Sequence, residues 1–312
     1  MGTKKKNHFK RYIKRNYDLY ILVLPGILFL LIFKYLPLLG NVIAFKDFKL
    51  NGGDTIFSAI VNSEWVGLKH FMRIFDNPAA LNAVKNTFII AGLKTIFLFP
   101  IPIIFALMLN EIRVNRFKRF AQTIMYFPNF LSWVVVGSLF NQILQTDGLL
   151  NSLLNIPQME RLSFLINPKY FRTILVLTDG WKSSGFATII YLSAIAGIGT
   201  EQYEAAIVDG VNRFQKMWHI TLPNISSTIA MVFVLTIGMQ VASGSFEQVL
   251  IMANPTVYST GDILQTFSYR KGLGAMEFSF STAAGMLNAI AGLIIIYSSN
   301  FASKKLFGKS IW

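Results

Sequence analysis

The sequence predicts an all-α membrane protein, because it is too apolar and too weakly charged for a water-soluble domain. Of its 312 residues, 53% are hydrophobic and 14% are charged, and the mean hydropathy is +0.49. Soluble domains have about 45–50% apolar and about 25% charged residues. The apolar residues also gather in stretches long enough to cross roughly 30 Å of hydrocarbon. The lipid bilayer is therefore the expected main solvent.

Six transmembrane helices are expected, with both termini in the cytoplasm. The spans lie near residues 19–45, 86–110, 120–144, 170–198, 225–253 and 282–306. Seven of the 29 basic residues precede the first span: Lys4, Lys5, Lys6, Lys10, Arg11, Lys14 and Arg15. Such a cluster fixes a cytoplasmic N-terminus, and an even number of spans returns the C-terminus to the same side. We interpret the net charge of +14 as a topology signal and not as a nucleic-acid site.

The chain is expected to form one membrane domain, residues 19–306, between a basic cytoplasmic N-terminus (1–18) and a short cytoplasmic C-terminus (307–312). Short interfacial helices are expected in the outer loop near 68–75 and 78–85. Five prolines fall inside the expected spans: Pro25, Pro37, Pro100, Pro102 and Pro128. Each removes a helical hydrogen bond and can kink its helix, either around a cavity or within ordinary packing.

The sequence shows no catalytic, metal-binding or nucleotide-binding motif. The absence of cysteine excludes disulfides and thiolate metal sites. The ending "SKKLFGKS" resembles a phosphate-binding loop, but no strand precedes it and no helix can follow it. The three histidines are far apart in the sequence. We therefore expect neither catalysis nor a bound metal or cofactor in this chain.

Ionisable side chains are few within the expected spans, where they are costly unless they pair or face a cavity. They are Lys34, Lys94, Asp179, Lys182 and Glu247. Asp179 and Lys182 lie three positions apart and can pair on one helix face, as a structural bridge or in contact with substrate. The structural bridge is the favoured reading.

A polar route through the membrane is a further hypothesis. Sugar sites combine an aromatic face with hydrogen-bonding side chains, and Trp181 and the stretch "QVASGSFEQ" offer both. The alternative is close helix packing at Gly244 and the serines. The candidate substrate-pathway residues are Asp179, Trp181, Lys182, Gln240, Ser243, Ser245, Glu247 and Gln248.

The stretch "EQYEAAIVDG", residues 201–210, predicts a short exposed helix with Thr200 as its N-cap and Gly210 as its end. A short loop at the membrane surface offers no protected pocket in which carboxylates could act as catalysts. Docking explains the pattern better, since small alanines allow close approach and the following segment carries exposed apolar side chains that can fill a groove. A merely solvated loop leaves those apolar residues unexplained.

The longer stretch "EQYEAAIVDGVNRFQKMWHITLPNI" resembles the EAA motif of the membrane subunits of ABC importers. The stretches "WVGLKHFMRIF", "YFPNFLSWVVVGSLF", "FEQVLIMANP" and "FGKSIW" resemble the carbohydrate-importer branch, and within it the LplB-like polysaccharide permeases. Val211 replaces the small residue that is common after the motif glycine. The resemblance covers nearly the whole chain.

This resemblance implies the fold of a type I ABC importer permease, with coupling helices within residues 200–224 that insert into an ATPase subunit. The implied coupling residues are Glu204, Ala205, Ala206, Asp209, Gly210, Phe214, Met217, Leu222 and Pro223. The implied partners are a second permease subunit, two ATPase subunits that use ATP and Mg²⁺, and an extracellular binding lipoprotein that delivers an oligosaccharide. The implied location is the plasma membrane of a Gram-positive bacterium.

The main alternative is an ion-coupled secondary transporter. That class commonly has inverted repeats and carboxylates at membrane depth. Neither a repeat nor such a carboxylate network is evident in the sequence. A membrane enzyme is a third class, for which the sequence holds no catalytic pattern.

Overall fold

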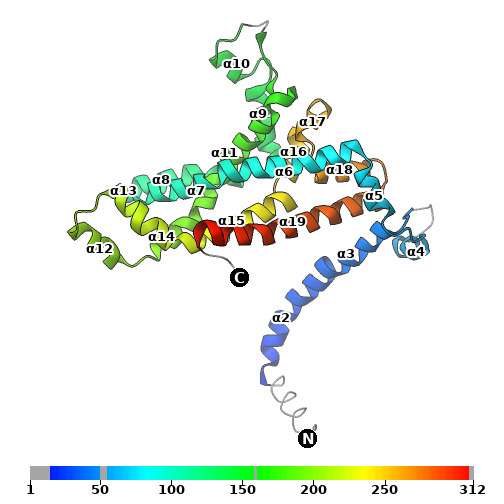
Figure 1. The fold of residues 1–312 in the computed structure, drawn as a ribbon, viewed down its shortest axis with the longest axis horizontal. Coiled ribbons are helices and arrows are strands. Elements are labelled where there is room, and N and C mark those ends of the chain that lie inside the picture. Colours follow the sequence, from blue (N-terminus) through cyan, green and yellow to red (C-terminus); the bar gives the residue numbers. More distant parts are fainter. Residues whose placement is uncertain (1–14, 50–54, 158–159, 309–312) are drawn as a thin grey trace.

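The computed structural model describes residues 15–49, 55–157 and 160–308. In these ranges the chain is built from helices, with one isolated antiparallel bridge between Lys46 and Trp65. The central bundle consists of α6 (Pro78–Leu98), α7 (Pro100–Asn110), α11 (Pro168–Ala196), α15 (Ser226–Ala242) and α19 (Phe278–Phe307). These helices follow the long axis of the molecule, with α15 packed along α19 and α7 along α11 (Figure 1).

Short helices cover the two ends of the bundle. One end, which we call the motif end, carries α12 (Thr200–Val208), α13 (Arg213–Lys216), η6 (Met217–Thr221) and α14 (Leu222–Asn224). The other end, the outer-loop end, carries α4 (Ile56–Asn62) and α5 (Lys69–Phe75). The expected interfacial helix at 68–75 is therefore present as α5.

The first span stands apart from the bundle. It runs from Tyr17 to Phe45 through α2 (Tyr17–Leu30), η1 (Leu31–Tyr35), α3 (Leu36–Leu39) and η2 (Gly40–Phe45). None of its most apolar part is buried within the described part of the chain. Only the η2 end packs against α19, and the rest leaves the bundle at an angle (Figure 1). Its apolar surface is therefore free to contact lipid or another subunit.

The second span begins eight residues earlier than expected. The Asn77 side chain caps α6 by accepting from the amides of Ala79 and Ala80, at 3.0 and 3.2 Å. Pro78 then occupies the first turn, where its missing N–H costs nothing. The prediction of a separate interfacial helix at 78–85 is wrong, because no helix-ending residue follows and α6 runs on to Leu98.

The expected span at 120–144 is bent sharply, in line with the kink predicted at Pro128. α8 (Asn115–Tyr126) and η3 (Phe127–Phe130) are followed by α9 (Trp133–Leu144) and α10 (Leu149–Leu153), and the direction changes by 100°. Pro128 lies buried in the bend, and Ser132 caps α9 by accepting from the Val135 amide. α9 and α10 project from the side of the bundle (Figure 1).

The expected span at 225–253 divides into α15 and α16 (Phe246–Met252). The break falls at the Ser243–Gly244–Ser245 sequence, where the Gly244 amide still bonds the Met239 carbonyl at 2.9 Å. Asn288 donates to the freed carbonyls of Val241 and Ala242, at 3.3 and 3.0 Å. The interruption is tolerated in an apolar setting because neighbouring side chains satisfy the backbone.

The chain then returns through η7 (Pro255–Val257), α17 (Tyr258–Gly261), α18 (Leu264–Tyr269) and η8 (Arg270–Gly274) to α19, and η5 (Phe164–Ile166) precedes α11. By length and composition, three helices of the described part can cross a membrane: Tyr17–Phe45, Pro78–Asn110 and Phe278–Lys305. The number rises to six if each of three bent helix pairs counts as one span. This agrees with the predicted all-α membrane fold.

Candidate functional site

The motif loop, which we define as residues 199–225, is a pair of short helices with a fixed turn between them. Gly210 has a φ of +70°, a conformation that side chains disfavour. The Gly210 amide bonds the Ile207 carbonyl at 3.1 Å, and the Val211 amide bonds the Ala206 carbonyl at 3.0 Å. These two bonds form a Schellman end to α12. The predicted helix end at Gly210 is confirmed.

The start of α12 differs from the expectation. Gly199 occupies the N-cap position, Thr200 is already the first helical residue, and no side chain caps the helix. The prediction of Thr200 as N-cap is therefore wrong. α13 starts more firmly, since Asn212 and Gln215 form a reciprocal capping box with two bonds of 2.9 Å.

Side-chain contacts join the two ends of the motif loop to each other, and Leu222 and Ile225 pack into the bundle beside Tyr191. The Tyr203 hydroxyl lies 3.0 Å from Thr221 Oγ1, and Asn224 donates to Gln202 at 2.8 Å. α12 meets α11 at a bend of 74°, and the segment ending in α14 meets α15 at 65°. The loop is therefore fixed at the motif end by contacts with its neighbours.

The predicted coupling residues fall on both faces of this loop. Ala206 is buried, while Met217 and Leu222 are partly buried. The others are exposed: Glu204, Ala205, Asp209, Gly210, Phe214 and Pro223. Phe214 is 80% exposed, and three further apolar residues of the motif loop, outside the predicted set, are exposed: Ile207, Val208 and Trp218. Such an apolar surface on a fixed loop is suited to contact with another protein.

A polar network occupies the interior of the bundle. Lys94 Nζ lies 2.8 Å from Asp179 Oδ2 and 2.6 Å from Gln248 Oε1. Gln248 Nε2 donates to the Leu175 carbonyl and to Thr178 Oγ1, at 2.8 and 2.7 Å. We call Lys94, Thr178, Asp179 and Gln248 the buried network. It joins α6, α11 and α16, and all four residues are at most 5% exposed.

The predicted pairing of Asp179 with Lys182 is wrong. Asp179 pairs with Lys94, whereas Lys182 Nζ donates to the carbonyls of Asn129 and Leu131, at 2.8 and 2.7 Å. Those carbonyls lie at the bend before α9, where the helical bonding pattern is interrupted. Three-residue spacing permits a pair on one helix, but stronger partners from other helices occupy both groups.

Two cavities adjoin the break between α15 and α16. The outer cavity, of about 730 Å³, is lined by the predicted residues Ser243 and Glu247 and by the unpredicted polar or aromatic residues Trp133, Gln265, Ser268, Tyr269, Ser281 and Thr282. The inner cavity, of about 230 Å³, is lined by Lys94, Asp179, Tyr191 and Gln240, among others. Trp133 and Gly244 line both cavities, so the two are adjacent.

The remaining predicted pathway residues lie elsewhere. Trp181 contacts Phe140 edge-to-face and lines an apolar cavity of about 400 Å³ on another side of α11. Gln248 is fully buried in the network and lines neither of the two polar cavities. Ser245 is also buried, and its Oγ has no hydrogen-bond partner in the described part of the chain. The structure thus brings Ser243, Glu247, Gln240 and Asp179 towards the cavities and separates Trp181 from them.

Comparison with known proteins identifies the class. Residues 99–308 match the family of binding-protein-dependent transport system inner membrane components, so the chain belongs to this family. The match covers the bundle after α6, the motif loop, the whole lining of the outer cavity and the lining of the inner cavity except Lys94 and Leu98. The chain is therefore a permease subunit of an ABC importer and a transport component, not an enzyme.

Individual relatives are similar over almost their whole length. The chain is 42% identical over 310 residues to a polygalacturonan/rhamnogalacturonan transport system permease protein of Bacillus subtilis, covering 99% of this chain and 94% of the relative. It is 42% identical over 294 residues to Protein LplB of the same species, covering 94% and 90%. A permease chain in the crystal structure of a bacterial ABC transporter for alginate import matches with a TM-score of 0.86 at 36% identity, covering 96% and 99%.

These matches confirm the predicted family and fold, and they exclude the alternative of an ion-coupled secondary transporter. Among the described residues there is no group of three or more His, Cys, Asp or Glu side chains that could hold a metal ion.

Proposed function

We propose that this permease imports an oligosaccharide released from an acidic polysaccharide, delivered by an extracellular binding protein. The observation that carries this proposal is the outer cavity, in which Trp133 and Tyr269 supply aromatic surfaces beside Glu247, Gln265 and serine hydroxyls. Such a combination suits a sugar ring, which has apolar faces and a polar rim. Relatives whose names refer to polygalacturonan and alginate support the acidic class.

The pathway in this proposal passes from the outer cavity to the inner one. Ser243 and Glu247 face the first, and Gln240 and Asp179 face the second. Gln240 Oε1 and the Tyr191 hydroxyl are buried at the inner cavity and have no partner in the described part of the chain. They are available to bond sugar hydroxyls or water. Trp181, Lys182, Ser245 and Gln248 support this route indirectly, through packing.

The motif loop in this proposal is the contact with an ATPase subunit. Glu204, Ala205, Asp209 and Phe214 present an exposed surface, and the Gly210 turn sets the angle between α12 and α13. Binding and hydrolysis of ATP with Mg²⁺ take place in two such partner subunits, and their closure moves the motif loop to alternate access to the cavities. The motif end then lies in the cytoplasm, together with residues 1–18 and 307–312.

A second, homologous permease completes the transporter in this proposal. The first span has a fully exposed apolar part, which is suited to contact with that subunit as well as with lipid. The location is the plasma membrane, with a binding lipoprotein on its outer face. We infer a Gram-positive source because the two similar relatives come from Bacillus subtilis.

ATP-dependent uptake by the complete transporter in proteoliposomes tests the proposal. The substrates are labelled galacturonate and alginate trisaccharides, each loaded on the binding protein, with a neutral trisaccharide of equal length for comparison. We expect uptake of an acidic trisaccharide that Glu204→Lys abolishes, because the reversed charge lies on the ATPase contact. Glu160→Lys, an equal charge reversal at an exposed site far from the motif loop, should leave uptake unchanged.

Two results would contradict the proposal. Uptake of the neutral trisaccharide alone would overturn the acidic substrate class. Unchanged uptake in Glu204→Lys would overturn the motif loop as the ATPase contact.

A further inference from the structure

The segment formed by α18 and η8 has one face towards the outer cavity and another towards an ion pair. Gln265, Ser268, Tyr269 and Gly272 line the cavity. Thr266 and Arg270 instead contact Asp262, which does not line it. Residues 266 and 270 share a face because they are four positions apart, and that face is turned by about 100° from the one with 265 and 269.

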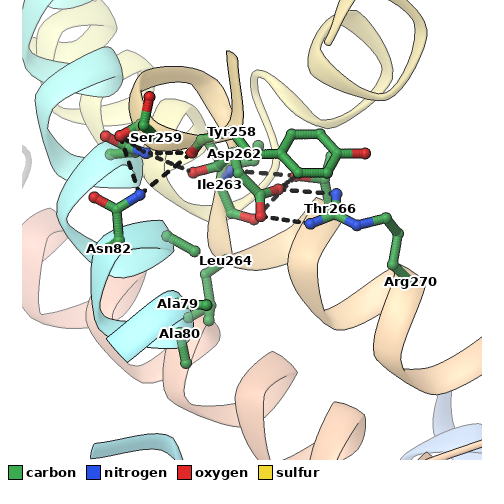
Figure 2. Close-up of polar contacts among 12 residues, drawn as sticks. Ala79, Ala80, Asn82, Tyr258, Ser259, Asp262, Ile263, Leu264, Thr266 and Arg270 are labelled. Carbon is green, nitrogen blue, oxygen red and sulfur yellow. Dashed lines mark hydrogen bonds and ion pairs between the residues drawn. The ribbon is translucent and has the colours of Figure 1, made fainter. Parts of the chain in front are cut away.

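Asp262 closes this second face into a compact cluster, which we call the outer clamp: Tyr258, Asp262, Thr266 and Arg270 (Figure 2). Arg270 Nη1 donates to Asp262 Oδ1 at 3.0 Å, and Nη2 donates to Oδ2 at 2.5 Å. Thr266 Oγ1 donates to Oδ1 at 2.7 Å. The Arg270 guanidinium also lies 4.0 Å from the centre of the Tyr258 ring. Every oxygen of the carboxylate is therefore engaged.

The loop that carries Asp262 is anchored to two long helices. Asn86 of α6 donates to the Asp262 carbonyl at 3.0 Å, and the Leu264 amide donates to Thr87 Oγ1 at 2.9 Å. Arg172 of α11 donates to the Thr260 carbonyl at 3.0 Å and to Asn86 Oδ1 at 2.7 Å. Asn82 adds a bond to the Ser259 carbonyl, visible in Figure 2. Hydrogen bonds to α6 and α11 therefore hold the outer clamp in place.

The cavity side of the segment combines a flexible turn with side-chain hydrogen bonds, among them one from Gln265 Nε2 to the Ala242 carbonyl. η8 is a π-helical turn that contains Gly272 and Gly274, two residues with high backbone freedom. Ser268 and Ser281 of α19, which both line the cavity, exchange hydrogen bonds of 2.8 Å. A buried ion pair adds little net stability over apolar packing, but a bidentate pair fixes orientation. The clamp is therefore better explained by geometry than by stability.

We propose that Asp262 and Arg270 are positioning residues for substrate: they hold the cavity wall so that Gln265 and Tyr269 face the sugar. Neither touches the sugar itself. This inference rests on the proposed function, because it requires the outer cavity to hold the oligosaccharide during transport.

The chain has no cysteine, so one cysteine introduced at the outer cavity is its only thiol. The labelling rate of that thiol tests whether substrate occupies the cavity. Leu273 lines the outer cavity and is 58% exposed, so Leu273→Cys is the reporter. The complete transporter carrying it is labelled in proteoliposomes with a membrane-impermeant maleimide, with and without galacturonate trisaccharide on the binding protein. ATP hydrolysis stimulated by the loaded binding protein is measured in parallel.

With the clamp intact, we expect the trisaccharide to slow labelling about fivefold, which corresponds to about 80% occupancy. Adding Arg270→Gln should weaken binding by roughly tenfold, the usual scale for a lost charge-assisted hydrogen bond, and so remove most of the protection. Stimulated ATP hydrolysis should persist, since the motif loop is untouched. Arg270→Lys keeps the charge but loses the bidentate geometry, and should show intermediate protection.

Arg161→Gln is the matched control. It removes an Arg–Asp contact of 2.9 Å to Asp147, at a site outside the cavity, and should retain full protection. Full protection with both Arg270→Gln and Arg270→Lys would overturn the inference and leave the cavity as the sugar site. No protection with the clamp intact would overturn the sugar site, and the inference with it. If Arg270→Gln does not assemble, Arg270→Lys decides, because full protection there also contradicts a positioning role.

Discussion

The motif loop and the buried network both carry residues that the sequence singles out, yet they are built in opposite ways. The motif loop gathers its residues within a few turns of chain, and most of them are exposed. The buried network joins Lys94 to Gln248, which are 154 positions apart, and shields both from solvent. A contact surface for another protein can be encoded in one short stretch of sequence. A hydrogen-bond network among three helices needs residues from distant stretches. Substitutions in the two regions should therefore fail in different ways.

The largest difference is expected between two glycines with positive φ, at opposite ends of the bundle. Gly210 has a φ of +70° and Gly67 a φ of +59°, and neither has a neighbour within 4 Å of an added Cβ. Gly210→Ala and Gly67→Ala should each cost about 1–2 kcal/mol in backbone strain. We expect only Gly210→Ala to lose most ATP-dependent uptake, because it changes the angle between α12 and α13 at the ATPase contact. Equal uptake in the two variants would remove the special role of the motif loop.

Substitutions in the buried network should lower the stability of the folded chain and leave the exposed surface of the motif loop unchanged. Lys94→Met leaves the Asp179 carboxylate buried without its cation, which should cost about 3–5 kcal/mol. Adding Asp179→Asn should recover a large part of the lost stability, because the double variant has no unpaired buried charge. Thermal unfolding of the four combinations in detergent measures the coupling between the two sites. Additive losses would show that the two side chains do not act as a pair.

A smaller effect separates two exposed phenylalanines. Phe214 on the motif loop is 80% exposed, and Phe301 on α19 is 77% exposed. We expect Phe214→Ala to weaken ATPase association by about tenfold, the scale of a buried aromatic anchor at an interface. Phe301→Ala should leave it unchanged. Co-purification at graded ATPase concentrations compares them, and equal weakening would argue against an anchor at Phe214.

The smallest expected effect is a change in the pH dependence of stability, caused by a buried histidine. His70 on α5 is 6% exposed, and Nε2 lies 3.2 Å from the Lys46 carbonyl. Burial lowers the pKa of His70 below its usual 6.5. The unfolded state therefore takes up the proton first, and stability should fall as the pH drops through the range below 6.5.

Thermal unfolding at about pH 8 and about pH 5.5, on either side of the usual histidine range, measures this contribution. We expect His70→Gln to reduce the difference between the two values. His219→Gln, at an exposed ring, is the control. A pH dependence that is unchanged in His70→Gln would assign the effect to other groups.

The predictability of the fold follows the same division between local and distant contacts. The end of α12 at Gly210 and the helix α5 follow from short signals of glycine and apolar spacing. The break at 243–245 does not, since it lies inside an apolar stretch and depends on a distant partner, Asn288. Pro128 predicts a kink before 131–132, but not a bend as large as 100°. Hydropathy measures where a chain can enter the membrane, and it is blind to bends within it.

The candidate site was predictable only in part, for the same reason. Glu247 and Ser243 stood out as polar residues in an apolar stretch, and both line the outer cavity. Trp133, Gln265 and Tyr269 come from other elements, and only folding brings them there. Asp179 was selected for the right reason, its cost in hydrocarbon, but paired with the wrong lysine because Lys94 is distant in sequence.

The exposed first span has a consequence for how the subunit is made. Residues 17–45 leave the ribosome before the other described spans, yet the described part of the chain buries none of their most apolar part. Where a partner permease covers this span, its apolar surface is buried only after the later spans have been made and the two subunits have met. An orphan subunit would then carry an exposed signal that membrane quality control could recognise, and the balance between the two permeases in the cell would be set by degradation of the unpaired one.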